Sequence, residues 1–158
     1  MTMNSDQEMR KMIIAVGCDH GGFPLKDTVI RAIRDCGHEV LDFGTHSPER
    51  TDYPDYGQKI GRAIQEGRAD RGVAMCGSGV GICITLNKMK GIYAAICHDT
   101  YSAHQGVEHD NMNVLCLGGR IIGTELAYEL VKAFLSARFI GTGNYLRRVE
   151  KVQALEER

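Results

Sequence analysis

The chain of 158 residues lacks an excess of charge of either sign. Its 19 lysines and arginines nearly balance 20 aspartates and glutamates, and the formal net charge is -1. The basic residues are scattered along the chain and form no stripe, which argues against a surface for polyanions. We therefore expect no nucleic-acid partner.

Long apolar segments are also missing. Nothing approaches the run of about 18 apolar residues that spans a membrane, and "MTMNSDQEMRKM" at the start is polar where a secretory signal needs an apolar stretch. These absences predict a soluble, cytoplasmic protein with no membrane partner. The length suits one domain with a sizeable core. We expect an extended or disordered segment at 1–11 and a single domain at 12–158.

The six cysteines include no CxxC pair. Without a secretory signal, and with several of them in apolar segments, they are predicted to be free thiols. His104 and His109 are five residues apart, so a helix would place them on different faces and they would not form a zinc site. The spacing of cysteines and histidines therefore predicts no metal site.

Short apolar, β-branched segments alternate with segments of helical spacing. Strands are predicted at 12–18, 38–43, 71–76, 92–97 and 113–118. Helices are predicted from Pro24 to Gly37, from Pro54 to Gly67 and from Thr124 onward. This alternation indicates an α/β fold with a five-stranded parallel sheet covered on both faces.

A last helix is predicted at 144–156. Its apolar residues form a narrow stripe on a charged helix, at Leu146, Val149, Val152 and Leu155. Such a stripe could pack on the domain's own core, but at the end of a complete sheet it could equally cover a second subunit. We favour packing on a partner subunit.

Ligands of open parallel sheets bind beyond the carboxyl ends of the strands. Ionisable residues and glycines gather there in this sequence, at Asp19 to Gly22, Cys76 to Gly81, His98 and Asp99, and Gly119 and Arg120. These positions are the first candidates for a functional site.

The segment "CGSGVGI" allows three interpretations. A dinucleotide fingerprint needs GxGxxG, but glycine occupies 77, 79 and 81 and Ile82 takes the last place, although Asp99 lies about where a ribose-binding acid would. Alternatively, a helix N-terminus favours the thiolate of Cys76 as a base or nucleophile, and the amides of 77–81 form a nest for an oxyanion. That pair could remove a proton next to a carbonyl. The third interpretation is a buried thiol at a tight turn.

Two acid and imidazole pairs accompany this segment. Asp19 and His20 follow the first strand, and His109 and Asp110 precede the fifth. Asp19 could instead cap a helix, and the others could be solvated surface residues. Arg120 and the pair Arg147 and Arg148 could hold an anionic group.

Five segments together identify a family resemblance. They are "GCDHGGFPLK", "GTHSPERTDYPDY", "CGSGVGICITLNK", "EHDNMNVLCLGGRIIG" and "RRVEKV". In this order, from about residue 12 to 155, the chain resembles the ribose-5-phosphate isomerase B and galactose-6-phosphate isomerase family. The resemblance implies a Rossmann-like three-layer α/β/α sandwich with strand order 2-1-3-5-4. It also implies active sites at a homodimer interface, with a tetramer as the alternative assembly.

The implied activity is a metal-independent, cofactor-free aldose–ketose isomerisation of a sugar phosphate. The leading expectation is interconversion of ribose 5-phosphate and ribulose 5-phosphate through a cis-enediolate. The resemblance makes Cys76 the base that moves a proton between C2 and C1. Ser78 would assist proton transfer at the substrate hydroxyl. The loop with Gly77, Gly79 and Gly81 would stabilise the enediolate oxygens.

The resemblance also assigns the remaining residues. His109 and Asp19 would open the furanose ring, and Tyr53 would line the sugar site. Phosphate contacts are implied for His20, Arg120 and Arg148. His109 and Arg120 are expected to come from the partner chain or to lie near that boundary.

Two positions depart from the family pattern and leave the sugar open. Relatives commonly have asparagine where this chain has Asp110, a further residue expected at the substrate, and many have arginine where it has Asn144. The alternative substrates are allose 6-phosphate, galactose 6-phosphate or a tetrose phosphate. A different class of function, a nucleotide- or sugar-binding module without turnover, is the other alternative.

Overall fold

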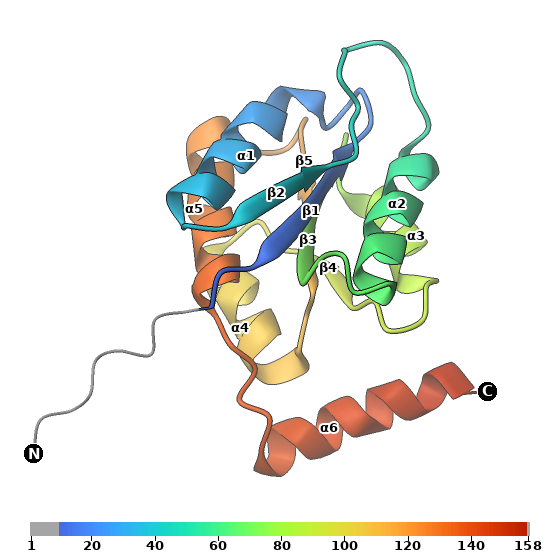
Figure 1. Ribbon diagram of the computed structural model, residues 1–158, viewed down its shortest axis with the longest axis vertical. Coiled ribbons are helices and arrows are strands. Elements are labelled where there is room, and N and C mark those ends of the chain that lie inside the picture. Colours follow the sequence, from blue (N-terminus) through green and yellow to red (C-terminus); the bar gives the residue numbers. More distant parts are fainter. Residues whose placement is uncertain (1–9, 158) are drawn as a thin grey trace, which may run out of the picture.

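The computed structural model describes residues 10–157, and its centre is a five-stranded parallel sheet (Figure 1). The strands are β1 (Ile13–Cys18), β2 (Glu39–Asp42), β3 (Arg71–Cys76), β4 (Ala94–Ile96) and β5 (Val114–Gly118). Their order is β2-β1-β3-β5-β4, and every neighbouring pair is parallel. The predicted fold class and strand order are confirmed.

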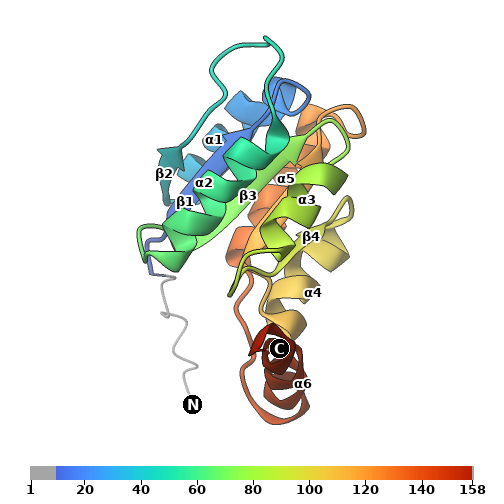
Figure 2. The ribbon, with the colours of Figure 1, turned by 90° about the vertical axis from the view of Figure 1, so that its right-hand side faces the viewer.

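Helices cover both faces of the sheet (Figures 1 and 2). One layer contains α1 (Lys26–Asp35), α4 (Thr100–Asp110) and α5 (Thr124–Ser136), and the other contains α2 (Tyr53–Gln65) and α3 (Val80–Asn87). A short 3-10 helix, Phe23–Leu25, precedes α1. The chain ends in α6 (Gly143–Gln153) and a second 3-10 helix, Ala154–Glu157. Within residues 10–157, no helix combines the length and apolar character needed to cross a membrane.

Two helices start at prolines, as the sequence predicted. Pro24 lies in the 3-10 turn that leads into α1, and Pro54 is in the first turn of α2. A proline has no amide hydrogen to lose there, and its fixed φ suits the start of a helix. Residues 1–9 of the predicted N-terminal segment lie outside the described residues, whereas Arg10 forms an ion pair with Asp70 at 2.6 Å.

The two ends of the sheet carry different segments. The chain leaves β1 and β3 on opposite sides of the sheet, so a crevice opens between their carboxyl ends. The loop of residues 43–52 rises above this end, whereas α6 lies beyond the amino ends of the strands (Figures 1 and 2).

Helix α6 contacts its own domain through a small part of its surface. Val149 is the buried residue of this helix. The other apolar residues of the predicted stripe remain exposed: Leu146 by 39 %, Val152 by 50 % and Leu155 by 59 %. The helix predicted at 144–156 is present, and most of its stripe is left without a cover in this chain.

Candidate active site

At the carboxyl end of the sheet, the loops after β1, β3 and β5 contact one another through glycines. A methyl group added to Gly21 would lie 2.7 Å from the backbone nitrogen of Gly77, and one added to Gly118 would lie 2.8 Å from the backbone of Ser78. Gly119 packs against the carbonyl of Gly21. Because contacts this short exclude any Cβ, glycine at these positions lets the loops after β1, β3 and β5 close on one another.

Cys76 ends β3 at the centre of this junction. Its side chain is 4 % exposed, and its Sγ accepts a hydrogen bond from the amide of Gly79 at 3.1 Å. Gly79 has a φ of 83°, in the left-handed region, and this turns its amide back toward the sulfur. A hydrogen bond to sulfur and the N-terminus of α3 both stabilise negative charge there.

The turn after Cys76 keeps amide groups available. Among residues 10–157, the backbone amides of Ser78 and Gly81 have no hydrogen-bond partner. The amide of Val80 donates to the hydroxyl of Ser78 at 3.2 Å. Free amides at a helix N-terminus can hold an anionic oxygen, so this turn has the donors that an oxyanion site needs.

Asp19 is buried and helps to shape its own turn. Its Oδ1 accepts hydrogen bonds from the amides of Gly21 at 2.8 Å and Gly22 at 3.0 Å. The other carboxylate oxygen, Oδ2, accepts none from residues 10–157. One carboxylate oxygen therefore accepts hydrogen bonds from the backbone, and the other is available to a ligand.

His20 is held by the loop above it. The amide of Thr51 donates to Nδ1 of His20 at 3.2 Å. A ring nitrogen that accepts carries no proton, so the neutral imidazole has its proton on Nε2. His20 can thus donate from Nε2 to an acceptor in the crevice.

Tyr53 and Arg120 lie over the glycine turn. A methyl group on Gly81 would fall 2.7 Å from the Tyr53 ring, and one on Gly77 would fall 3.3 Å from a terminal nitrogen of the Arg120 guanidinium. The amide of Arg120 also donates to the carbonyl of Gly77 at 2.9 Å. Arg120 was expected from the partner or near its boundary. It lies beside Gly77 of its own chain, because β5 adjoins β3.

A cavity of about 510 Å³ opens beside these residues. Asp19, His20 and Tyr53 line it, together with Arg50, Thr51 and Asp52 at the end of the 43–52 loop. Sequence reasoning did not single out Arg50 or Thr51. The hydroxyl of Thr51 is buried and has no hydrogen-bond partner among residues 10–157.

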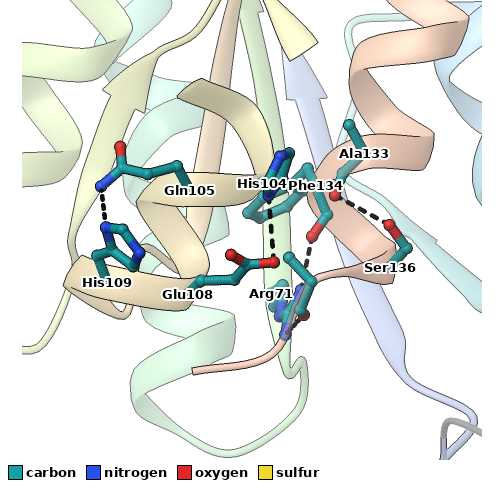
Figure 3. Close-up of polar contacts among 9 residues, drawn as sticks. Arg71, His104, Gln105, Glu108, His109, Ala133, Phe134 and Ser136 are labelled. Atoms are coloured by element: carbon teal, nitrogen blue, oxygen red, sulfur yellow. Dashed lines mark hydrogen bonds and ion pairs between the residues drawn. The ribbon is translucent and has the colours of Figure 1, made fainter. Parts of the chain in front are cut away.

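His109, Asp110 and Arg148 lie at the opposite end of the molecule. Helix α4 starts near the carboxyl ends of the strands and runs back along the sheet, so its last residues reach the amino ends. Nδ1 of His109 is 2.9 Å from Nε2 of Gln105 on the same helix (Figure 3), and the His109 ring stacks on Tyr145 of α6 with centroids 4.7 Å apart. Asp110 and Arg148 line a cavity of about 300 Å³ at α6. A single chain does not bring this group to Cys76.

The residues after β4 have structural partners. His98 accepts a hydrogen bond on Nε2 from the amide of Gly118 at 3.1 Å, and burial lowers the pKa of His98. Asp99 caps α4 by accepting from the amide of Ser102 at 2.7 Å, and this bond lowers the pKa of Asp99. The carboxylate that a nucleotide-binding interpretation would need is therefore engaged as a helix cap. All six cysteines are free thiols.

Known proteins are similar to this chain along most of its length. Residues 14–152 match the ribose/galactose isomerase family. Ribose-5-phosphate isomerase B of Escherichia coli is 46 % identical, over 92 % of this chain and 97 % of the relative. D-erythrulose-4-phosphate isomerase of Pectobacterium atrosepticum is 42 % identical, over 88 % of this chain and 91 % of the relative.

A solved structure agrees with these sequence matches. Ribose-5-phosphate isomerase B of Clostridium thermocellum superposes with a TM-score of 0.88 at 43 % identity, covering 92 % of this chain and 98 % of that one. The likeness therefore extends over nearly the whole fold. The chain belongs to the ribose/galactose isomerase family of enzymes.

Proposed function

We propose that the protein interconverts ribose 5-phosphate and ribulose 5-phosphate by proton transfer through a cis-enediolate. The observation that carries the proposal is the Sγ of Cys76 at 3.1 Å from the amide of Gly79, beside a turn with free amides. A base next to an oxyanion site is the equipment that aldose–ketose isomerisation requires. The family relatives named above support the substrate class.

The chemistry follows from these positions. The thiolate of Cys76 takes the proton from C2 of the open-chain aldose, and the released electron pair forms the C1–C2 double bond while O1 takes the negative charge. Amides of the glycine turn hold this charge. A proton then passes from O2 to O1 with help from the Ser78 hydroxyl, and the thiol returns its proton to C1. The carbonyl now lies at C2, which is the ketose.

Ring opening precedes this step. It needs a base for the anomeric hydroxyl and an acid for the ring oxygen. Asp19 lies at the crevice with Oδ2 available, and we assign the second role to His109 of a partner subunit. His20, Arg120 and the Arg148 of the partner would contact the phosphate, and Tyr53 would line the sugar site over Gly81.

A two-subunit site explains why the catalytic residues fall at two ends of one chain. Val80 and Ile84 on α3 are 48 % and 58 % exposed next to the glycine turn, and the stripe of α6 is exposed as well. Apolar faces of this kind mark interaction surfaces. We propose a homodimer in which the partner's α6 covers α3 and carries its neighbouring His109, Asp110 and Arg148 to Cys76.

A tetrose phosphate is the second candidate substrate. The relative from Pectobacterium atrosepticum is named for D-erythrulose 4-phosphate and is 42 % identical. Asp110 and Asn144 distinguish this chain from the common family pattern at positions expected near the substrate. A panel of tetrose, pentose and hexose phosphates distinguishes the candidates. Turnover of the pentose phosphate a thousandfold slower than of another sugar would overturn the first choice.

Replacement of the thiol tests the mechanism itself. Cys76→Ala should lower kcat by about a thousandfold or more, because the general base is removed. The matched control is Cys36→Ala, a thiol at the end of α1 away from the crevice, which should keep its rate. Because no metal is assigned a role, dialysis against a chelator should leave the rate unchanged. Wild-type turnover in Cys76→Ala would remove the thiol from the mechanism.

A further inference from the structure

Among residues 10–157, Arg50 provides the one permanent positive charge on the lining of the 510 Å³ cavity beside the catalytic turn. The other ionisable groups there are the imidazole of His20, the phenol of Tyr53 and three carboxylates, Asp19, Asp52 and Asp55. An anionic ligand would be repelled by such carboxylates without a cation to offset them. Arg50 is therefore the lining residue that can offset these carboxylates, in addition to Arg120 and the partner's Arg148 proposed above for the phosphate.

The guanidinium of Arg50 is uncommitted. Among residues 10–157 it forms no hydrogen bond, ion pair or ring contact, whereas Arg10, Arg62, Arg68 and Arg71 each have such a partner. A planar guanidinium without a partner can bind a phosphate through two parallel hydrogen bonds. Its solvent exposure leaves it free to do so.

The loop that carries Arg50 is anchored at both ends. At its start, the Nζ of Lys26 contacts Asp42 at 2.9 Å and donates to the carbonyl of Thr45 at 2.7 Å. At its end, the amide of Thr51 donates to His20 at 3.2 Å. Since Arg50 directly precedes Thr51, its stem begins next to His20, and the two nitrogen-bearing side chains face the same cavity.

The direction of the substrate places its phosphate away from Cys76. In an aldose phosphate, C1 and C2 react and the phosphate is carried by the last carbon. With C1 and C2 at Cys76, the phosphate lies at the far end of the sugar from the thiol, and the cavity lined by His20 and Arg50 can receive it. Tyr53 joins the two regions, because its ring covers Gly81 and also lines the cavity.

We propose that Arg50 binds the phosphate group of the substrate together with His20. The inference rests on the proposed function for the identity of the substrate as a sugar phosphate. Its chemistry is that of a phosphate monoester dianion recognised by a guanidinium and an imidazole N–H. The residue selects for phosphorylated sugars and takes no part in proton transfer.

The test uses Arg50→Ala and Arg50→Lys in the full chain. Arg50→Ala should raise the KM for ribose 5-phosphate roughly tenfold to a hundredfold, with a smaller change in kcat, because hydrogen bonds to a charged group are lost. Arg50→Lys should restore part of the loss, since it keeps the charge but not the paired geometry. Glu49→Ala is the matched control, a neighbour on the same loop that does not line the cavity, and it should keep the wild-type KM.

A binding measurement separates this proposal from the isomerase mechanism. Titration calorimetry with inorganic phosphate on Cys76→Ala and on Cys76→Ala with Arg50→Ala needs no turnover. The second protein should bind phosphate about tenfold more weakly or worse. Equal phosphate affinity in the two proteins would overturn the role of Arg50, even if isomerisation is confirmed. A weaker affinity in the second protein would support it, even if Cys76 proves dispensable.

Discussion

A methyl group is too large for the contact between Gly21 and Gly77. In Gly21→Ala the new Cβ would lie 2.7 Å from the Gly77 nitrogen, so the turn must move away from Cys76. We expect a loss of about 1–3 kcal/mol in the free energy of unfolding and a fall in kcat. Urea denaturation and initial rates measure both. Gly123→Ala adds its methyl to open space and should keep the rate; equal effects of the two substitutions would contradict this account.

Two histidines with lowered pKa values, His38 and His98, make the free energy of unfolding depend on pH. Burial lowers the pKa of His98, and burial followed by the charge of Arg71 lowers the pKa of His38. Below about pH 6.5 the unfolded chain binds protons that the folded chain does not. The stability from these groups is therefore complete above that pH and is lost as the pH falls through the lowered pKa values.

The test compares unfolding of the wild type and His98→Gln between pH 8 and pH 5. Glutamine can still accept from the Gly118 amide but does not titrate, so the variant should lose less stability on acidification. Exposed pairs such as His104 with Glu108 at 3.1 Å (Figure 3) are common to both proteins and cancel in the difference. Parallel pH profiles for the two proteins would exclude His98 as a source of the acid sensitivity.

At the scale of elements, Lys26 joins α1 to the end of β2. Its side chain is 6 % exposed and pairs with Asp42 at 2.9 Å. Lys26→Met removes the donor from Oδ2 of Asp42 and from the Thr45 carbonyl, whereas Oδ1 of Asp42 still accepts from the Gly44 amide at 2.8 Å. We expect a loss of about 2–3 kcal/mol, below the usual cost of a fully buried pair because Asp42 is partly exposed. Lys11→Met breaks an exposed pair with Glu39 and should cost less than about 1 kcal/mol.

The measurement is the free energy of unfolding from urea titrations of the two variants and of Asp42→Asn. If Lys26→Met and Lys11→Met lost the same small amount, the buried pair would not anchor the loop. A second readout is the KM for the sugar phosphate. It should rise in Lys26→Met and stay at the wild-type value in Lys11→Met, since the loop anchored by Lys26 carries Arg50 to the cavity.

The sequence predicted those helices and strands that depend on patterns among neighbouring residues. Alternating strands and helices, prolines at helix starts and glycines at strand ends are properties of neighbouring residues, and they placed Cys76 and Asp19 at one edge. Lys26 gave no such signal, because a lysine in a helix normally belongs to a solvated face. Its burial depends on Asp42 and Thr45, which only the folded chain brings near.

Arg50 was missed for a related reason. One arginine in a polar loop resembles any surface charge, and its value comes from the cavity that the loop encloses. The position of His109 was also beyond a local pattern. It depends on the length and direction of α4, which carry the residue past the sheet to Tyr145.

For the whole molecule, the exposed stripe of α6 predicts a dimer that activity requires. The double variant with Leu146→Glu and Val152→Glu should be monomeric by light scattering and should lose most of its kcat. Charged groups would be buried at the proposed contact with the partner's α3, and this is unfavourable. Gln153→Glu adds a carboxylate to the same helix outside the stripe and should remain an active dimer. A fully active monomer would defeat the two-subunit site.

The placement of Cys76 and His109 at opposite ends has a genetic consequence under this proposal. A subunit that lacks the Cys76 thiol still supplies an intact His109 to its partner, and a subunit that lacks His109 still has an intact thiol. Two alleles that each encode an inactive protein would then complement one another in a mixed dimer. One of its two active sites contains both the intact thiol and the intact imidazole.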